Sequence, residues 1–530
     1  MKSFCLVIFS ALLLASCQST PSEESAEVER PNILFCIADD ASFPHMGAYG
    51  CSWVNTPGFD RVAKEGLLFT RAYTPNAKCA PSRSCILTGR NPWQLEEAVN
   101  HFPNFPAKFK TYAEALSEHG YHVGHTAKGW GPGNPGEING QPRELVGPAY
   151  NERQTTPPTS AMLNNDYAAN FADFLDARPK GEPFCFWYGG LEPHRVYEYG
   201  SGLAKGGKQL SDIDEVMPFW PDTDSVRTDM LDYAYEIEYF DQHLQQMLTL
   251  LEERGELDNT LVVVTADNGM PFPRIKGQEY EYSNHLPLAI MWKDGIAKAG
   301  QTIETMVNFI DFTPTFLEVA QVSPEKSGMQ AITGTSLTNI FSGETIASDD
   351  RDRVLIGKER HDVGRPNDQG YPIRGIVKGD FLYLQNFEPD RWPVGNPETG
   401  YLNTDGGATK TVILNQRRSG ANTDFWKLCF GKRPSEELYQ IGRDPACLSN
   451  LANSPEHQGI KDQLRSQMLS ELEEQGDPRI LGNGDILEGY EYAGEATRGF
   501  YERYMAGEDI EARWVNESDF EEEPIEDEGR

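Results

Sequence analysis

Three aspartates and one asparagine directly follow apolar runs in two distant parts of the chain. Asp39 and Asp40 end the stretch NILFCIADD, and Asp267 and Asn268 follow LVVVTA. Their carboxylate and amide oxygens form an all-oxygen ligand set, which suits Ca²⁺ or Mg²⁺ better than Zn²⁺. Taken singly, Asp-Asp after a strand is also typical of a helix cap or a solvated turn, and Asn-Gly is a common turn. Together, the two pairs predict a site for a hard divalent cation.

Several basic or titratable side chains also follow apolar runs. Lys128 comes after YHVGHTA, and His194 comes after PFCFWYGGLEP. A histidine that titrates near neutrality suits general acid catalysis, although a loop histidine can equally serve structure. Lys276 stands two residues after Arg274, and either of these cations could face an anionic substrate.

The elements that must position these residues alternate between strands and helices, which predicts an α/β fold with a large, mostly parallel sheet flanked by helices. We expect a strand in the run 32–40, a buried strand that opens into a loop over 183–195, a buried strand in 261–269, a helix at 111–120, and one long helix at 226–254. In open sheets of this kind, functional groups gather beyond the carboxyl ends of the strands. The two acidic pairs, Lys128 and His194 are expected at those ends.

Changes in composition and in the pattern of apolar runs divide the chain into five parts. Residues 1–16 form an apolar leader, 17–30 a polar tether, 31–345 the catalytic domain, 346–480 a smaller α+β domain with an antiparallel sheet, and 481–530 an acidic extension. The chain carries 47 Lys and Arg against 81 Asp and Glu, a net charge of −34, which argues against nucleic acid as a partner. The acidic stretch that begins at Asn516 is expected to be a solvated, loosely ordered tail.

The leader resembles a bacterial secretion signal. Leu14-Ala15-Ser16-Cys17 is similar to a lipobox, in which Cys17 would be lipidated, while an ordinary cleaved signal with a chance cysteine remains the alternative. We expect a protein of the bacterial cell envelope, held in the outer membrane only through its N-terminal lipid, or otherwise in the periplasm.

The stretch CAPSRSCILTGR resembles the signature C-x-P-S-R…T-G-R of the type I, formylglycine-dependent sulfatases of the alkaline phosphatase superfamily. The signature positions are Cys79, Pro81, Ser82, Arg83, Thr88, Gly89 and Arg90. The alternative for Cys79 is a buried structural cysteine at a helix N-terminus. Cys85 lies outside the signature and is expected in the core. The resemblance extends from Pro31 to about Ala452 and implies an alkaline-phosphatase-like sandwich.

The resemblance implies a reaction as well as a fold. A formylglycine-generating or sulfatase-maturating enzyme would oxidise Cys79 to 3-oxoalanine (formylglycine), whose hydrate attacks the sulfur of a sulfate ester. One Ca²⁺ ion would be held by Asp39, Asp40, Asp267, Asn268 and position 79, while Arg83, Lys128 and Lys276 stabilise the anionic sulfuryl group. Asp267 would take a proton from the hydrate and His194 would protonate the leaving group.

Within the family, three segments are most similar to the sulfamidase-like branch (N-sulfoglucosamine sulfohydrolase) and its bacterial polysaccharide relatives. These segments are EPHR at 192–195, DNGMPFPR at 267–274, and RHD…GYPIR at 360–374. From the last of them, the residues expected to contact the sugar are Arg360, His361, Asp362 and Arg374, with an ordinary ion-pair network as the alternative. The expected partner is a sulfated carbohydrate, such as an algal glycan like ulvan or a glycosaminoglycan.

One position departs from the family. Many members have a histidine two residues after the lysine, but this chain has Trp130 there. Either another base replaces it, with His101 and His125 as candidates, or that step of the reaction runs differently. Two other functions stay open on sequence alone. One is a phosphonate or phosphate ester hydrolase of the same superfamily, and the other is a glycan-binding lipoprotein whose active site has decayed.

Overall fold

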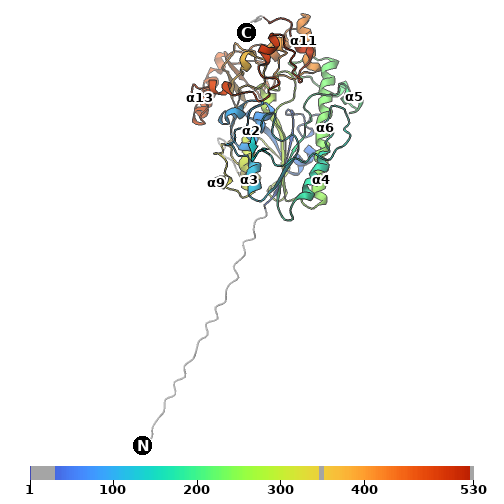
Figure 1. Ribbon diagram of the computed structural model, residues 1–530, viewed down its shortest axis with the longest axis vertical. Coiled ribbons are helices and arrows are strands. Elements are labelled where there is room, and N and C mark those ends of the chain that lie inside the picture. Colours follow the sequence, from blue (N-terminus) through green and yellow to red (C-terminus); the bar gives the residue numbers. More distant parts are fainter. Residues whose placement is uncertain (2–29, 345–350, 526–530) are drawn as a thin grey trace.

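The computed structural model describes residues 1, 30–344 and 351–525. Cys17, the proposed boundary between residues 345 and 346, and the last five residues therefore lie outside the described part of the chain. Figure 1 shows a central sheet between two groups of helices, with α2 and α3 on one side and α4 and α6 on the other. Among the described residues, no helix is both long and apolar enough to cross a membrane.

The described residues contain one large sheet of eight strands, in the order β10-β2-β8-β7-β1-β6-β3, with β9 beside β2. The strands are β1 (Asn32–Ala38), β2 (Leu67–Tyr73), β3 (His122–Ala127), β6 (Phe184–Gly189), β7 (Thr260–Ala266), β8 (His285–Met291), β9 (Gln301–Ile303) and β10 (Val307–Asn308). Strand β1 pairs in parallel with β6 and β7, β3 pairs in parallel with β6, and only β8 runs antiparallel to its neighbours. The predicted mostly parallel sheet is confirmed.

Both faces of this sheet are buried, as continuous apolar strands require. Residues such as Leu34 pack with the core under α1 (Pro57–Glu65), α4 (Tyr167–Ala177) and α6 (Asp224–Glu253), whereas the alternate residue Phe35 packs with the opposite core. The helices of that second core are α2 (Cys79–Thr88), α3 (Tyr112–Glu118), α8 (Phe312–Val319) and α10 (Thr338–Phe341). The predicted long helix and the predicted helix at 111–120 are therefore present within two residues of their expected limits.

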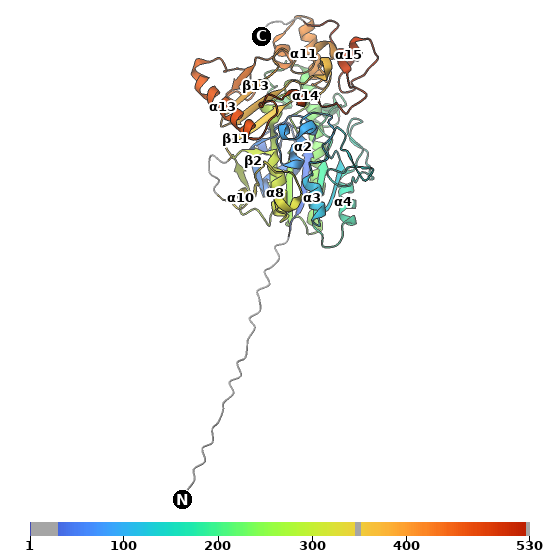
Figure 2. The ribbon, with the colours of Figure 1, turned by 60° about the vertical axis from the view of Figure 1, so that its left-hand side comes forward.

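A second, smaller sheet lies in the C-terminal part of the chain. Strands β11 (Arg353–Lys358), β12 (Ile373–Lys378), β13 (Phe381–Asn386) and β14 (Glu436–Tyr439) pair in sequence order and are all antiparallel. Figure 2 shows this part seated at one end of the large sheet. The predicted smaller α+β unit with an antiparallel sheet is confirmed.

The remaining elements are short or lie outside the two main sheets. They are β4 (Glu137–Ile138), β5 (Gln141–Pro142), α5 (Ser201–Ala204), α7 (Glu281–Asn284), α9 (Pro324–Ser327), α11 (Ala408–Arg418), α12 (Asp424–Phe430), α13 (Gln458–Glu474), α14 (Asp485–Gly489) and α15 (Phe500–Met505).

The acidic extension differs from the expected solvated tail. Its described residues fold back onto the domain, and Asp519 is fully buried in an ion pair with Lys410, 3.1 Å between Oδ2 and Nζ. Trp514 Nε1 donates a hydrogen bond to the carbonyl of Leu402 at 2.7 Å. Charge density alone predicted solvation, but a lysine buried in the domain provides this acid with a partner.

Candidate active site

The two acidic pairs meet where β1 and β7 end. These strands lie in parallel register, with Ala38 opposite Ala266, so the residues that follow them emerge side by side. The backbone N–H of Asp40 donates to Asp267 Oδ1 at 3.1 Å, and Asn268 Nδ2 donates to Asp40 Oδ1 at 2.7 Å. The structure thus brings the four predicted oxygen ligands together.

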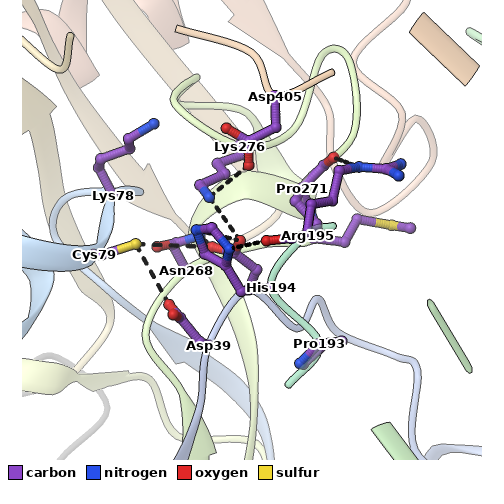
Figure 3. Close-up of polar contacts among 12 residues, drawn as sticks. Asp39, Lys78, Cys79, Pro193, His194, Arg195, Asn268, Pro271, Lys276 and Asp405 are labelled. Carbon is purple, nitrogen blue, oxygen red and sulfur yellow. Dashed lines mark hydrogen bonds and ion pairs between the residues drawn. The ribbon is translucent and has the colours of Figure 1, made fainter. Parts of the chain in front are cut away.

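Cys79 is the first residue of α2 and lies next to the aspartates (Figure 3). Its Sγ is 3.4 Å from Asp39 Oδ1, and one ligand atom from each of Cys79, Asp39, Asp40 and Asp267 lies within 4.8 Å of the others. Burial raises the pKa of the Cys79 thiol well above its usual value, and the Asp39 carboxylate raises it further. An unmodified Cys79 would be protonated and a poor nucleophile.

The rest of the cysteine signature builds and anchors α2. Ser82 Oγ donates to the carbonyl of Asp267 at 2.6 Å, which ties the first turn of the helix to the end of β7. Thr88 is the last helical residue. Gly89 ends the helix with a left-handed backbone (φ 67°), and its backbone N–H donates a hydrogen bond to the carbonyl of Cys85. Gly89 is suited to this position because it has no Cβ. Cys85 is fully buried, as expected.

Arg83 holds Asp267 from the same helix. Its Nε donates to Asp267 Oδ2 at 2.8 Å, and its Nη1 donates to the carbonyls of Lys128 and Gly129 at 2.8 and 2.7 Å. Its Nη2 lies 3.7 Å from Asp39 Oδ1. Burial raises the pKa of Asp267 and the Asp39 charge adds to this rise, whereas Arg83 opposes it.

Two lysines are ion-paired with different aspartates. Lys128, which follows β3, has its Nζ 2.5 Å from Asp39 Oδ2, and Lys276 Nζ lies 2.7 Å from Asp40 Oδ2. Although burial raises the pKa of Asp39, the nearby Lys128, His194 and Arg83 together hold that pKa below its usual range. Arg274 instead donates to backbone carbonyls and lies over the Tyr280 ring. Of the two candidate cations, Lys276 is the one that faces the site.

His194 lies in the loop after β6, at the more open side of the site. Its side chain is 26% exposed, whereas the aspartates are fully buried, and its Nε2 is 3.8 Å from Asp40 Oδ2. Its Nδ1 donates a hydrogen bond to the carbonyl of Arg195 at 2.6 Å, so that Nε2 is left to face the site. Arg195 is itself fixed by a bidentate ion pair with Asp229, 2.7 Å for each bond.

The donor set fits a hard divalent cation. It combines three buried carboxylates with the amide of Asn268, whose Oδ1 is buried and lacks a hydrogen-bond partner among the described residues. A buried acceptor left without a donor is costly unless something else binds it. Oxygen donors in this number and charge suit Ca²⁺, in which case Asp39, Asp40, Asp267 and Asn268 would hold the ion.

Sequence reasoning missed Asp405, which precedes α11. Its Oδ2 is 2.7 Å from Lys276 Nζ, and it forms with Asp40 and His194 a second cluster of close ligand atoms. It lies in the stretch NTDGGATK, which contains no recognisable spacing to the other site residues. Only the fold reveals it.

The predicted sugar-contact residues separate into two groups. Asp362 lies beside Lys78 and His101, at 2.8 and 2.9 Å, and His361 Nε2 is hydrogen-bonded to Asn76 Oδ1 at 2.8 Å. Arg360 Nη1 donates to the carbonyl of Tyr490, while its Nε and Nη2 are buried without a partner among the described residues.

Arg374 belongs elsewhere. It is fully buried between Glu359 and Asp477, at 2.8 and 2.7 Å. The prediction that it contacts the sugar does not fit this placement, because both carboxylates already occupy its guanidinium. The ion-pair alternative describes it better.

Neither His101 nor His125, the candidates to replace the base that is absent at Trp130, occupies the position of that tryptophan. Trp130 Nε1 donates to Ser84 Oγ at 2.8 Å, and its ring packs against Phe105. His125 Nδ1 is bound to the carbonyl of Gly147 at 2.9 Å, and His101 to Asp362. The tryptophan thus contacts α2 through Ser84.

Comparison with known proteins agrees with this geometry. The family model described as Sulfatase matches residues 31–322, more than half of the chain. The human N-sulphoglucosamine sulphohydrolase is 27% identical over 90% of this chain and 95% of its own length, and an ulvan-active sulfatase of Formosa agariphila is 27% identical over 86% and 82%.

Solved structures share the fold. One is a protein in complex with its substrate D-glucosamine-2-N,6-O-disulfate, with a TM-score of 0.58 and 20% identity over 84% of this chain and 98% of that one. The expected alkaline-phosphatase-like architecture is therefore confirmed. The chain belongs to the type I sulfatase family, a family of sulfuric ester hydrolases.

Proposed function

We propose that this protein hydrolyses sulfate esters of a sulfated polysaccharide or its oligosaccharides, with a formylglycine made from Cys79 and one Ca²⁺ ion. The observation that carries the proposal is the position of Cys79. It heads a helix with the complete maturation signature, and it is buried beside an all-oxygen ligand set and three cations. A sulfated glycan is favoured because relatives with that substrate class in their names match most of the chain.

The chain's own residues would divide the work as follows. Formylglycine supplies, as its hydrate, an oxygen nucleophile, and Ca²⁺ supplies a fixed positive charge beside it. Arg83, Lys128 and Lys276 provide preorganised positive charge for a sulfuryl group, in a site that excludes most water. Asp267, which has a carboxylate oxygen within 4.8 Å of Cys79 Sγ, would take a proton from the hydrate.

His194 would protonate the departing oxygen or nitrogen. Because Nδ1–H donates to the carbonyl of Arg195, the ring would act as the imidazolium, whose second proton lies on Nε2, facing the site, and passes to the leaving atom. An N-sulfated amine would need the same proton on its leaving nitrogen. N-sulfoglucosamine hydrolysis is therefore the variant of this reaction to test alongside ester hydrolysis.

The direct test is sulfate release from ulvan, carrageenan, fucoidan and heparan oligosaccharides by the matured protein. We expect release from at least one of these substrates and none by Cys79→Ala. Matched aryl sulfate and aryl phosphate esters provide the control for reaction class, and a strong preference for phosphate would contradict the proposal.

We also propose that Cys17 is lipidated and holds the enzyme at the cell envelope, and that a sulfatase-maturating enzyme is its partner before export. The support is the leader sequence and the maturation signature alone. Cys17→Ser should release the protein from the membrane fraction, and co-expression with a maturating enzyme should raise the aldehyde content at position 79.

A further inference from the structure

A second cluster of buried charges lies on the C-terminal-domain side of the reacting site. Lys78 directly precedes Cys79, the first residue of α2, and Figure 3 shows its side chain lying away from Asp39. Its Nζ is 2.8 Å from Asp362 Oδ2, and His101 Nδ1 is 2.9 Å from Asp362 Oδ1. All three side chains are at least nine-tenths buried, with exposed fractions of 2%, 3% and 8%.

This cluster is electrostatically joined to the reacting site. Burial raises the pKa of Asp405, but Lys276 and then Lys78 lower it below its usual range. Lys276 in turn contacts Asp40. Lys78 directly precedes position 79 in the chain, although the proposed chemistry does not use its side chain.

The cluster also has unused hydrogen-bonding capacity. An ammonium has three N–H donors, and Lys78 forms one ion pair among the described residues, with Asp362 Oδ2. Because His101 Nδ1 donates to Asp362, its Nε2 is an acceptor, and this atom is buried without a partner among the described residues. Burial lowers the pKa of His101 to about 4, so the ring is neutral at pH 7. A lysine donor and an imidazole that also carries an acceptor thus contact the two oxygens of the Asp362 carboxylate.

We infer that Lys78, His101 and Asp362 form a specificity subsite for uncharged hydroxyl groups of the sugar that bears the sulfate. A hydroxyl can both donate and accept, and so it matches a lysine N–H beside an imidazole acceptor. An anionic substituent can only accept, and it would face the Asp362 carboxylate and the His101 lone pair. Each lysine here is already balanced by an acid, Lys78 by Asp362 and Lys276 by Asp405.

This inference rests on the proposed glycan sulfatase function and adds two residues, Lys78 and His101, to the predicted contact at Asp362. Truncation of a hydrogen bond that involves a charged group reduces binding by about ten- to a hundredfold. We therefore expect His101→Gln, Asp362→Asn and Lys78→Met to lower kcat/KM for the preferred sugar sulfate by that factor, relative to kcat/KM for p-nitrophenyl sulfate. The aryl ester lacks the sugar hydroxyls and reports the chemistry alone.

Two controls keep the test decisive. Lys208→Met removes another largely buried, ion-paired lysine, bound to Glu238, and should leave the ratio unchanged. Mass spectrometry of the Cys79 peptide shows whether each variant is matured, which matters most for Lys78→Met. His101 lies outside the maturation signature. If Lys78→Met is not matured, the test therefore depends on the ratio of sugar to aryl activity of His101→Gln.

A substrate series identifies the ligand group. Wild type should lose activity on the single-deoxy analogue of the sulfated sugar that lacks the contacted hydroxyl, and His101→Gln should show no further loss on that same analogue. Equal losses of aryl and sugar activity, or an unchanged ratio, would overturn the inference. So would a preference for a second sulfate that depends on Lys78. If wild type cleaves the aryl ester but no sugar sulfate, the proposed glycan function fails instead.

Discussion

At the scale of single residues, each buried aspartate around position 79 forms an ion pair with a lysine or arginine and also has a carboxylate oxygen within 4.8 Å of Cys79 Sγ. Lys128 holds Asp39, Arg83 holds Asp267, and Lys276 joins Asp40 to Asp405. His194 differs because it is the most exposed of these side chains and has one ring nitrogen facing the site. Its placement suits a group that meets the leaving half of the substrate.

The role of His194 predicts a dependence on the leaving group. General acid catalysis contributes about 10²- to 10⁴-fold when the departing group is a poor one. We expect His194→Ala to lower kcat by a factor in that range for a sugar sulfate, and by much less for p-nitrophenyl sulfate, whose phenolate leaves without a proton. Equal losses on both substrates would contradict the assignment.

His101 predicts how stability changes with pH. Its pKa is lowered to about 4 in the folded protein, chiefly by burial, whereas an unfolded histidine titrates near 6.5. The unfolded state therefore takes up the proton first as pH falls. The contribution of His101 to stability is complete above pH about 6.5 and is lost between about 6.5 and 4, roughly 3 kcal/mol in all.

Urea denaturation at pH 7, 6 and 5 measures this effect. The denaturation midpoint of wild type should fall over that interval, and His101→Gln should show a flatter dependence because glutamine does not titrate. A variant with the same slope as wild type would show that other groups determine acid sensitivity.

At the scale of elements, strand ends were predictable and loop contacts were not. The apolar runs before Asp39 and Asp267 predicted β1 and β7, and parallel pairing brings their ends together with no further information. Asp405 was missed because its contact with Lys276 depends on how the C-terminal domain docks, and no spacing in the sequence encodes that. Arg374 was misplaced for the same reason, since Asp477 lies 103 residues away.

The C-terminal extension supports the loop that carries Asp405. Lys410 Nζ donates to the carbonyl of Thr404 at 2.8 Å and pairs with the buried Asp519. Asp519→Asn leaves that lysine uncompensated, and loss of one partner of a buried pair costs about 3–5 kcal/mol. We expect a lower melting temperature and lower activity, checked by calorimetry and by sulfate release.

Glu523→Gln provides the matched control for Asp519→Asn. Glu523 lies in the same acidic stretch but is exposed, so its neutralisation should change stability by less than about 0.5 kcal/mol. If both variants behave alike, the extension acts through its overall charge rather than through the Lys410 pair.

At the scale of the whole molecule, the acidic cluster links cation binding to stability. Three neighbouring carboxylates repel one another, and a metal ion bound among them would offset this repulsion. A ligand that binds only the folded state stabilises that state, by about 2.7 kcal/mol at a hundred times its Kd. We expect EGTA to lower both activity and melting temperature, and added Ca²⁺ to restore both. An unchanged melting temperature after complete removal of calcium would argue against a resident ion.

The central claim is that position 79 acts as an aldehyde hydrate rather than as a thiol. The direct measurement is mass spectrometry of the peptide that contains residue 79, in preparations matured to different extents, alongside sulfate release by the same samples. We predict a peptide that has lost H₂S and gained one oxygen relative to the thiol form, with activity proportional to its fraction. Full activity in protein whose Cys79 is entirely thiol would contradict the claim.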